Sequence, residues 1–221
     1  MSALEPVVAK LAGDPAHDEN QRTISEAIGA DHGAIDVYSD NIKTASTLQE
    51  KIEWRNQFTW ALARHAVSEE LTLYPVMEKK LGQKGKEMAD VDREQHMAVK
   101  KDLYELQDMS PDNKDFFPLL DILMTDLHKH IEHESNEDMP RLEEILTREE
   151  SKSLANYFEK TKLILPTRSH PSAPNKPYFE NFAAMLAAPI DKFMDLLRAF
   201  PEEGKLGDVS ASEAPAVVQK S

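Results

Sequence analysis

Residues 116–134 read FFPLLDILMTDLHKHIEHE, and strictly helical spacing marks out one face of this stretch. The positions on that face follow one another at intervals of 4, 3, 4, 3 and 4 residues: Phe116, Leu120, Leu123, Leu127, His130 and Glu134. Apolar side chains at these intervals are typical of a helix that buries one stripe against neighbouring helices. The stretch therefore predicts a packed helix whose last two core positions carry an imidazole and a carboxylate.

Three further stretches show the same kind of stripe. Their positions are Ile24, Ile28, His32, Ile35, Tyr38 and Ile42; Phe58, Leu62, His65, Glu69, Leu73 and Val76; and Met88, Asp92, His96, Val99, Leu103 and Leu106. No window alternates apolar and polar residues with the period of two that marks a half-buried strand. We therefore predict an all-α protein in which four helices pack as a bundle, with additional C-terminal helices.

Breaks in these patterns divide the chain into parts. We expect a flexible leader at 1–18, a four-helix bundle at 19–148, a helical extension with a proline-rich linker at 149–200, and a disordered tail at 201–221. Within the bundle, turns are expected near residues 44–48, 82–85 and 110–113, and the second and fourth helices are expected to end near Pro75 and Pro140. In the extension we expect a short helix near 154–163. We expect an apolar segment at 178–200 to cap the bundle or form a homodimer interface.

Composition excludes several classes of protein. The 40 acidic residues outnumber the 26 lysines and arginines and give a formal net charge of −14, so a nucleic-acid or membrane-surface partner is not expected. The chain has no cysteine, which excludes disulfides, thiolate metal sites and a cysteine nucleophile. The first residues do not resemble a signal peptide, and no apolar run approaches the roughly 18 residues of a membrane span. We therefore expect a cytoplasmic protein.

Polar residues that interrupt the four stripes are the main functional signal. His32, His65, His96 and His130 each lie on the stripe of a different helix, and Glu69 and Glu134 follow two of them at i+4, on the same face. A single core histidine is commonly satisfied by a neighbouring carbonyl or hydroxyl. Six polar side chains that converge in one dry core would instead be very costly, unless bound cations compensate their charges.

The chain also repeats this pattern, which indicates the number of cations. HAVSEELTLYP at 65–75 and HIEHESNEDMP at 130–140 share the pattern H-x3-E-x5-P, and each is preceded by a lone stripe histidine. Two such helical hairpins would build a pseudo-symmetric site for two metal ions. Imidazole and carboxylate ligands without thiolate suit iron, manganese or zinc, and the balance of charges favours a redox-active pair.

Other residues near these stripes offer alternative or supporting roles. His133 can be a substitute ligand or a hydrogen-bond donor to a ligand, Glu137 can compete with Glu134, and Glu70 can compete with Glu69 although it points about 140° away from His65. His128 is expected to face solvent, and His17 and His170 are poor candidates for ligands. The aromatic residues are expected in the core or, alternatively, as a lining of the metal site with a tyrosine donor: Tyr38, Trp54, Phe58, Trp60, Tyr74 and Tyr104.

Residues from about 20 to 148 resemble the hemerythrin-like HHE cation-binding family, through His32, H-x3-E at 65–69, His96 and H-x3-E at 130–134 in that order. The resemblance implies an up-down-up-down four-helix bundle around two iron ions that share an oxo or hydroxo bridge. It makes the four histidines terminal ligands, and Glu69 and Glu134 the carboxylates that span the two ions. The segment PTRSHP at 166–171, followed by a C-terminal apolar segment, resembles the fungal HHE proteins.

Two positions differ from those of the oxygen-carrying hemerythrins. Those proteins have a fifth histidine one turn after the third-helix ligand, where this chain has Lys100, and H-x4-D on the last helix, where it has H-x3-E. The resemblance is therefore to the broader HHE group, which includes iron and oxygen sensors and nitric-oxide and stress-related proteins.

Three functions follow from this reading. The first is a non-haem di-iron protein that binds iron and a small ligand such as dioxygen, nitric oxide or peroxide, in sensing, storage or detoxification. The second is a di-iron oxidase or oxygenase that uses the same ligands, and the third is a structural bundle whose site holds zinc or remains empty. The sequence leaves open whether the protein is an enzyme.

Overall fold

A computed structural model describes residues 22–171, 191–192 and 194–206 of the chain. The helices of this part are α2 (Ile24–Thr44), α3 (Leu48–Leu81), α4 (Gln83–Leu106), α5 (Phe116–His133), α6 (Met139–Ile145) and α7 (Arg148–Lys162). A π-helical turn, η2 (Glu134–Asp138), joins α5 to α6, and a short 3₁₀ turn, η3 (Glu203–Lys205), lies near the end. The described residues contain no strand, so the prediction of an all-α protein is confirmed.

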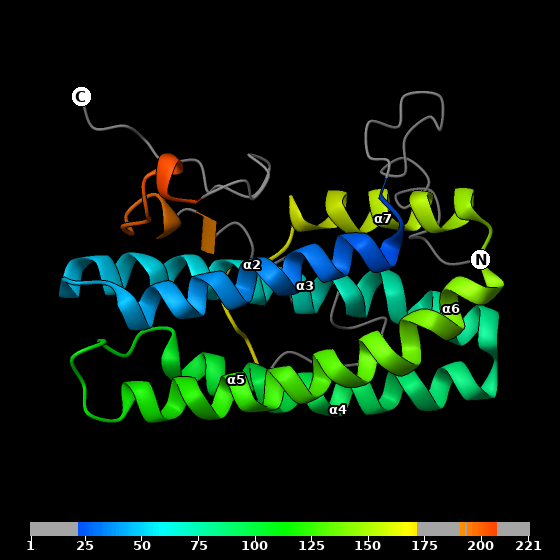
Figure 1. The fold of residues 1–221 in the computed structure, drawn as a ribbon, viewed down its shortest axis with the longest axis horizontal. Coiled ribbons are helices and arrows are strands. Elements are labelled where there is room, and N and C mark those ends of the chain that lie inside the picture. The colour runs from blue at the N-terminus through cyan, green and yellow to red at the C-terminus, as the bar shows by residue number, and fades with distance from the viewer. Residues whose placement is uncertain (1–21, 172–190, 193, 207–221) are drawn as a thin grey trace.

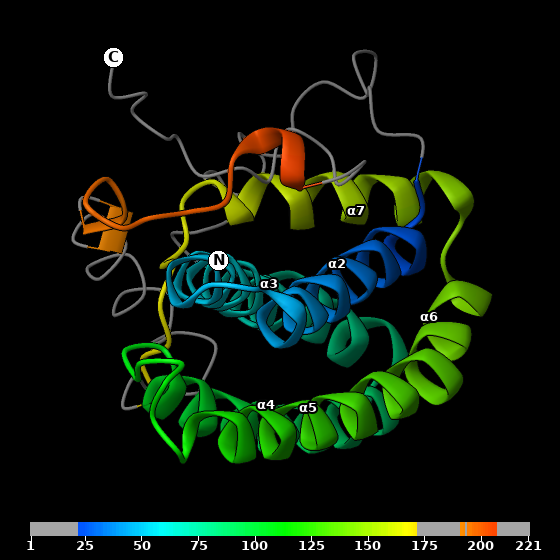
Figure 2. The same ribbon diagram turned by 60° about the vertical axis from the view of Figure 1, so that its left-hand side comes forward.

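Helices α2 to α5 form the bundle. Short connections make successive helices antiparallel, and α2 lies beside α3 in one layer while α4 and α5 form the opposite layer (Figures 1 and 2). Helix α7 lies outside this bundle, on α2 and α3, and α6 lies at the end of the bundle where α5 continues (Figure 2). No helix of the described residues is long and apolar enough to cross a membrane.

Capping residues explain where three of these helices begin. Thr23, Thr47 and Thr147 precede α2, α3 and α7, and each threonine hydroxyl accepts a hydrogen bond from the backbone N–H three residues later. The side chain at that third position is a glutamate in all three helices, and it accepts the backbone N–H of the threonine in return. Such a capping box satisfies two of the N–H groups that a helix start leaves without partners.

The expected helix ends at Pro75 and Pro140 are wrong. Helix α3 runs through Pro75 to Leu81, and the helical path after α5 runs through Pro140, in the first turn of α6, to Ile145. A proline inside a helix removes one hydrogen bond and costs about 3 kcal/mol. Burial of the neighbouring Tyr74 and Met77, both fully inaccessible to solvent, offsets that cost in α3.

The apolar core is divided into two parts by a polar layer. One cluster includes Ile35, Leu62, Val99 and Leu127, and the other includes Ile28, Leu73, Met88 and Leu142. On each of the first three helices, the stripe histidine falls between a residue of one cluster and a residue of the other. The predicted ligands therefore lie midway along the bundle, with packed apolar side chains on both sides.

Segments after α7 return to the bundle. Ser169 donates its backbone N–H to Gln107 Oε1 (2.9 Å) and its hydroxyl to the Lys100 carbonyl (2.6 Å), while Arg168 binds the Gln107 carbonyl at the end of α4. Further on, Asn56 donates to the Ala199 carbonyl, and Leu206 packs in the first core cluster. The predicted leader at 1–18, most of the apolar segment at 178–200 and most of the tail at 201–221 lie outside the described residues.

The turn between α3 and α4 depends on two glycines. Gly82 has a φ of 60°, a backbone conformation that residues other than glycine rarely adopt. A Cβ atom on Gly85 would lie 2.0 Å from the Met77 carbonyl oxygen and 2.6 Å from its carbon, so the two helices can approach this closely only with glycine at this position.

We predict that Gly85→Ala destabilises the protein, by about 2 kcal/mol or more, because the new methyl group must displace backbone atoms. Urea unfolding followed by circular dichroism measures the free energy of unfolding. Gly29→Ala is the matched control, since Gly29 is exposed within α2 and a Cβ there meets no atom within 4 Å. The control should be neutral or stabilising, and equal losses in both variants would contradict the packing argument.

Candidate metal centre

The structure brings all six predicted ligands together in the polar layer of the bundle. His32 comes from α2, His65 and Glu69 from α3, His96 from α4, His130 from α5, and Glu134 from the start of η2. All six are buried, and the most accessible of them, His32, is only 4% exposed. Because four separate helices supply them, the site exists only when the bundle is assembled.

The four imidazoles meet in two pairs through their Nε2 atoms. His32 Nε2 lies 3.1 Å from His65 Nε2, and His96 Nε2 lies 3.0 Å from His130 Nε2. Two nitrogens bound to one metal at about 2.1 Å and at right angles to each other would be about 3.0 Å apart. The spacing within each pair therefore fits two adjacent ligands of a single ion.

Glu69 stands between the two pairs. Its Oε1 lies 3.1 Å from His65 Nε2, and its Oε2 lies 3.1 Å from His96 Nε2 and 4.0 Å from His130 Nε2. His32, His65 and Glu69 thus form one group of potential ligands, and Glu69, His96 and His130 form another. A carboxylate with one oxygen in each group has the arrangement of a bridge between two ions.

Glu134 lies beside the first group, with Oε2 3.6 Å from His32 Nε2. Neither its oxygens nor those of Glu69 meet a hydrogen-bond donor of proper geometry among the described residues, although both carboxylates are fully buried. Buried carboxylates without donors are costly, and metal ligation removes this cost. The donor set therefore fits a pair of divalent cations.

Outer partners orient the imidazoles toward this centre. Acceptor oxygens lie close to Nδ1 of three histidines: Asp31 Oδ2 at 3.1 Å from His65, Gln95 Oε1 at 3.0 Å from His130, and Glu70 Oε1 at 3.4 Å from His96. A proton held on Nδ1 by such an acceptor leaves the lone pair of Nε2 directed at the centre, as metal-binding histidines require.

The protein's own charges in this layer are unevenly distributed. Burial raises the pKa of Glu134 well above its ordinary range, and the nearby Glu69 adds to the effect. Burial alone would raise the pKa of Glu69 too, but His65 and His96 outweigh it and hold that pKa well below its usual range. Burial lowers the pKa of His32 to about 3, whereas Glu69 and Asp31 overcome the burial of His65 and raise its pKa to about 10. Glu69 and Glu134 therefore differ in how readily they give up a proton, and so do His32 and His65.

Lys100 and Glu70 form a second buried group beside His96. The Lys100 ammonium pairs with both oxygens of Glu70. Burial would raise the pKa of Glu70, but Lys100 and His96 together lower it to about 2. Glu70 therefore supports His96 from outside the centre and does not replace Glu69. The buried Tyr74 hydroxyl, 3.2 Å from His96 Nε2, lies on the same side.

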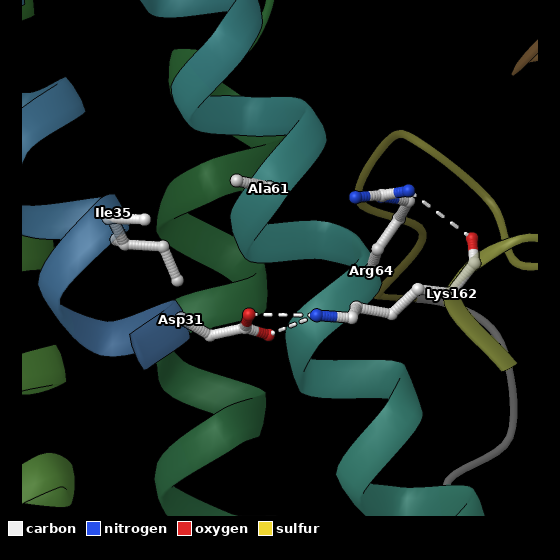
Figure 3. A pocket seen from close by; sticks show the side chains of 6 residues that line it. Asp31, Ile35, Ala61, Arg64 and Lys162 are labelled. Carbon is white, nitrogen blue, oxygen red and sulfur yellow. Dashed lines mark hydrogen bonds and ion pairs between the residues drawn. The ribbon is translucent and has the colours of Figure 1, made fainter. Parts of the chain in front are cut away.

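Helix α7 contributes to the surroundings of His65 from outside the bundle. Lys162 reaches between α2 and α3, and its Nζ lies 2.7 and 3.0 Å from the two oxygens of Asp31, which contacts His65 in turn (Figure 3). Both residues of this ion pair are buried. Arg64 donates to the Lys162 carbonyl, and these side chains line a small cleft with Ala34, Ile35 and Ala61 (Figure 3). The predicted C-terminal extension therefore places a positive charge, that of Lys162, beside the carboxylate that contacts His65.

Most of the alternative residues lie elsewhere. His128 is exposed and pairs with Asp36, Glu137 is exposed and pairs with Arg141, and His170 pairs with Asp191. Trp54, Phe58, Trp60 and Tyr38 are buried, as expected of core aromatics, whereas Tyr104 is 54% exposed and this expectation was wrong for it. Tyr104 lies on the solvent face of α4 because the seam of that helix follows Val99, Leu103 and Leu106.

A third cluster lies on the outer side of His130. It consists of Asp92 on α4, His133 at the end of α5 and Asp138 at the end of η2, with one potential ligand atom from each within 4.8 Å of the others. Asp92 Oδ1 lies 3.9 Å from His130 Nδ1. Burial raises the pKa of Asp92 to about 8, and the adjacent Asp138 adds to the effect.

Sequence reasoning missed the residues around the ligands. Asp31, Gln95 and Lys162 were not assigned to the site, although Asp31 and Gln95 directly precede His32 and His96. Lys100 was named only as the residue at the position of a fifth histidine. Asp92 carried a usable signal, because it occupies the third apolar stripe one turn before His96. Lys162 carried none, since it lies on a different element, far along the chain.

We predict that Lys162→Met destabilises the protein by about 3 kcal/mol, because it removes the ammonium that pairs with both oxygens of the buried Asp31 carboxylate. The double variant Asp31→Asn with Lys162→Met should recover part of this loss, since it removes both charges. Urea unfolding of the wild type, the two single variants and the double variant completes the cycle. Strictly additive effects would show that the pair is not coupled.

We also predict that the metal-free protein loses stability through Asp92 as the pH rises. The folded protein keeps the Asp92 proton up to about pH 8, whereas the unfolded chain releases it near pH 4. The contribution of Asp92 to the free energy of unfolding is therefore fully present below about pH 4 and is lost as the pH rises toward 8. Over this range the free energy of unfolding falls by at most about 1.4 kcal/mol per pH unit.

Urea unfolding of the chelator-treated protein between pH 5 and pH 8 measures this effect. Asp92→Asn should flatten the profile relative to wild type, because asparagine does not titrate. Asp90→Asn is the control, since Asp90 is exposed and Lys86 holds its pKa below the ordinary range. The same pH slope in wild type and Asp92→Asn would contradict the prediction.

Comparisons with known proteins agree with this geometry. A model of the hemerythrin HHE cation-binding domain matches residues 23–142. An uncharacterized hemerythrin-like protein of Schizosaccharomyces pombe is 49% identical over 178 residues, which cover 80% of this chain and 88% of the relative. No solved structure matches the chain. With four histidines and two glutamates converging from four antiparallel helices, this chain belongs to the hemerythrin HHE cation-binding family.

Proposed function

We propose that the protein binds two iron ions in the polar layer of the bundle and presents them to a small ligand such as dioxygen, nitric oxide or peroxide. The observation that carries this proposal is the position of Glu69, whose two oxygens each lie 3.1 Å from an Nε2 atom of a different histidine pair. His32 and His65 would hold one ion, and His96 and His130 the other. Glu69 would bridge them, and Glu134 would provide the second carboxylate.

The residues around the centre would control what reaches it. Two iron ions supply a pair of redox-active Lewis acids to a small ligand. Apolar clusters on both sides exclude bulk water, and the charge of two divalent cations exceeds that of two carboxylates, so anionic and polarisable ligands are favoured. Four imidazoles and two carboxylates do not fill two six-coordinate shells, which leaves room for such a ligand.

The presence of a lysine at position 100 supports a role in sensing, storage or detoxification and argues against reversible oxygen carriage. Oxygen-carrying hemerythrins have a histidine at this position, whereas the Lys100 ammonium is engaged by Glu70 and is a poor ligand while protonated. The second pair of histidines therefore has no additional imidazole from this position of α4.

The position of the Tyr74 hydroxyl supports a second candidate function, that of an oxidase-type enzyme that uses the same centre. Its buried hydroxyl lies 3.2 Å from His96 Nε2, where it can donate a hydrogen bond or a proton to a ligand at the second ion. Tyr74→Phe separates the two candidates: a binding protein keeps its ligand affinity within a few fold, whereas an oxidase loses most of its turnover with peroxide or dioxygen.

We predict that Glu69→Ala abolishes binding of both irons and that Glu134→Ala abolishes binding of at least one, while both variants keep most of their helicity. Metal analysis of anaerobically purified protein gives the stoichiometry, and circular dichroism gives the helicity. Glu137→Gln is the matched control, since Glu137 is exposed beside Glu134 in the same π turn. If both alanine variants keep two irons per chain, these ligands are wrong.

The absorption spectrum of the wild type tests the identity of the metals. Two irons per chain, with near-ultraviolet bands in air that bleach on reduction by dithionite, support the di-iron proposal. Rapid autoxidation favours a sensor or an oxidase, and a persistent oxygen-dependent visible band favours oxygen carriage. Stoichiometric zinc, or a fully stable protein without metal, would favour the structural reading.

Three further expectations belong to this proposal. We propose the division of the chain at residues 18, 148 and 200, which would keep all six ligands within one domain. We propose a cytoplasmic location. We further propose that the apolar segment at 178–200 caps the bundle, with a homodimer through the C-terminal extension as the alternative. Sedimentation equilibrium of the full chain distinguishes the dimer from the capped monomer.

A further inference from the structure

We propose that Asp92, His133 and Asp138 form a separate mononuclear site for a divalent transition-metal cation, beside the proposed dinuclear centre. The three side chains come from two parts of the bundle: Asp92 from α4, and the other two from the end of α5 and from η2. One ligand atom from each lies within 4.8 Å of the others. A cation among them would therefore join Asp92 of α4 to the segment that ends α5 and forms η2.

The two carboxylates are buried without a hydrogen-bond donor. Asp92 and Asp138 are both 0% exposed, and none of their four oxygens meets a hydrogen-bond donor of proper geometry among the described residues. The cationic side chains nearby are directed elsewhere, since Arg93 pairs with Glu78 and Asp90, and the exposed Arg141 pairs with Glu137. When both are ionised, two adjacent buried carboxylates repel each other, and a cation between them relieves this repulsion.

The π turn explains how His133 and Asp138 come together. In an α-helix, residues five apart point about 140° away from each other. In η2 the Met139 N–H instead donates to the Glu134 carbonyl, five residues earlier, so the turn is wider. This widening brings His133 Nε2 to 3.6 Å from Asp138 Oδ2. It also leaves Glu134 directed at the dinuclear centre, so one helical segment serves two sites.

The chemistry of the three ligands selects the kind of cation. One imidazole and two carboxylates suit Mn(II), Fe(II) or Zn(II), whereas sites made only of oxygen suit magnesium or calcium. The side chain of His133 is 35% exposed, so a cation can reach this site from solvent. The incomplete ligand set leaves positions for water.

The position of the cluster further suggests a role in loading the dinuclear centre, a role that rests on the proposed function. On its inner side, Asp92 lies 3.9 Å from Nδ1 of His130, one of the proposed ligands. On its outer side, His133 meets solvent. The cluster therefore lies between solvent and the second histidine pair, where it can hold an incoming ion.

Manganese binding to the full-length chain, freed of metal by a chelator, tests the mononuclear site. Equilibrium dialysis against Mn(II) should give three ions per wild-type chain. Electron paramagnetic resonance should show the six-line signal of an isolated Mn(II) in addition to a coupled pair. Asp138→Asn should bind two ions and lose the six-line signal, because an amide replaces one carboxylate without a change in size.

Two further variants complete the comparison. Glu137→Gln alters the exposed neighbour in the same π turn and should keep all three ions. Glu69→Ala should lose the coupled pair and keep the isolated ion, so failure of the dinuclear proposal and failure of the mononuclear site are distinguishable. A wild type without an isolated Mn(II), or an Asp138→Asn variant that retains it, would overturn the site.

The loading role has its own readout. When metal-free protein is mixed with Fe(II) in air-saturated buffer, the rise of near-ultraviolet absorption reports how fast the dinuclear centre fills and is oxidised. Asp138→Asn should slow this rise by roughly tenfold, the size of effect common for residues that support a metal site, without a change in the final amplitude. An unchanged rate in a variant that has lost the isolated ion would leave the site in place and overturn its role in loading.

Discussion

The rest of this structure depends on the contacts that the buried Glu69 carboxylate makes with the two histidine pairs. Its two oxygens each lie 3.1 Å from an imidazole of a different histidine pair, in a layer from which solvent is excluded. A carboxylate in such a place must be neutralised, and His65 of α3 and His96 of α4 do so, since they hold its pKa well below the usual range. The long helices, their tight connections and the apolar clusters on either side hold these groups at ligand distance.

Charge compensation extends outward from that layer in ordered steps. Asp31 contacts the outer nitrogen of His65, and Lys162 of α7 compensates Asp31 in turn. On the opposite side, Glu70 contacts His96 and is compensated by Lys100. Each imidazole pair is therefore supported by a carboxylate and an ammonium, and α7 is joined to the polar layer electrostatically as well as by packing.

The π turn after α5 shows how a local irregularity extends what one helix can do. With regular α-helical spacing, His133 and Asp138 would face different directions. The wider turn places Asp138 beside His133 and Asp92, while Glu134, at its start, still faces the four histidines. Such π turns are rare within helices and are frequent at functional sites. Here the turn accounts for an acidic pair that the regular repeat of H-x3-E-x5-P does not predict.

The sequence by itself determined the helical class, the four buried stripes and the six polar positions that interrupt them, because the period of an α-helix assigns each residue to a face whatever its partners are. It also led to the wrong helix ends at Pro75 and Pro140, because burial of Tyr74 and Met77 outweighs the local cost of a proline. Only the tertiary structure decided that Lys162 supports His65, that Lys100 engages Glu70 and that Asp92 meets Asp138. Those contacts join residues on separate elements, and no local periodicity encodes the distance between two helices or the side chain that a neighbouring element supplies.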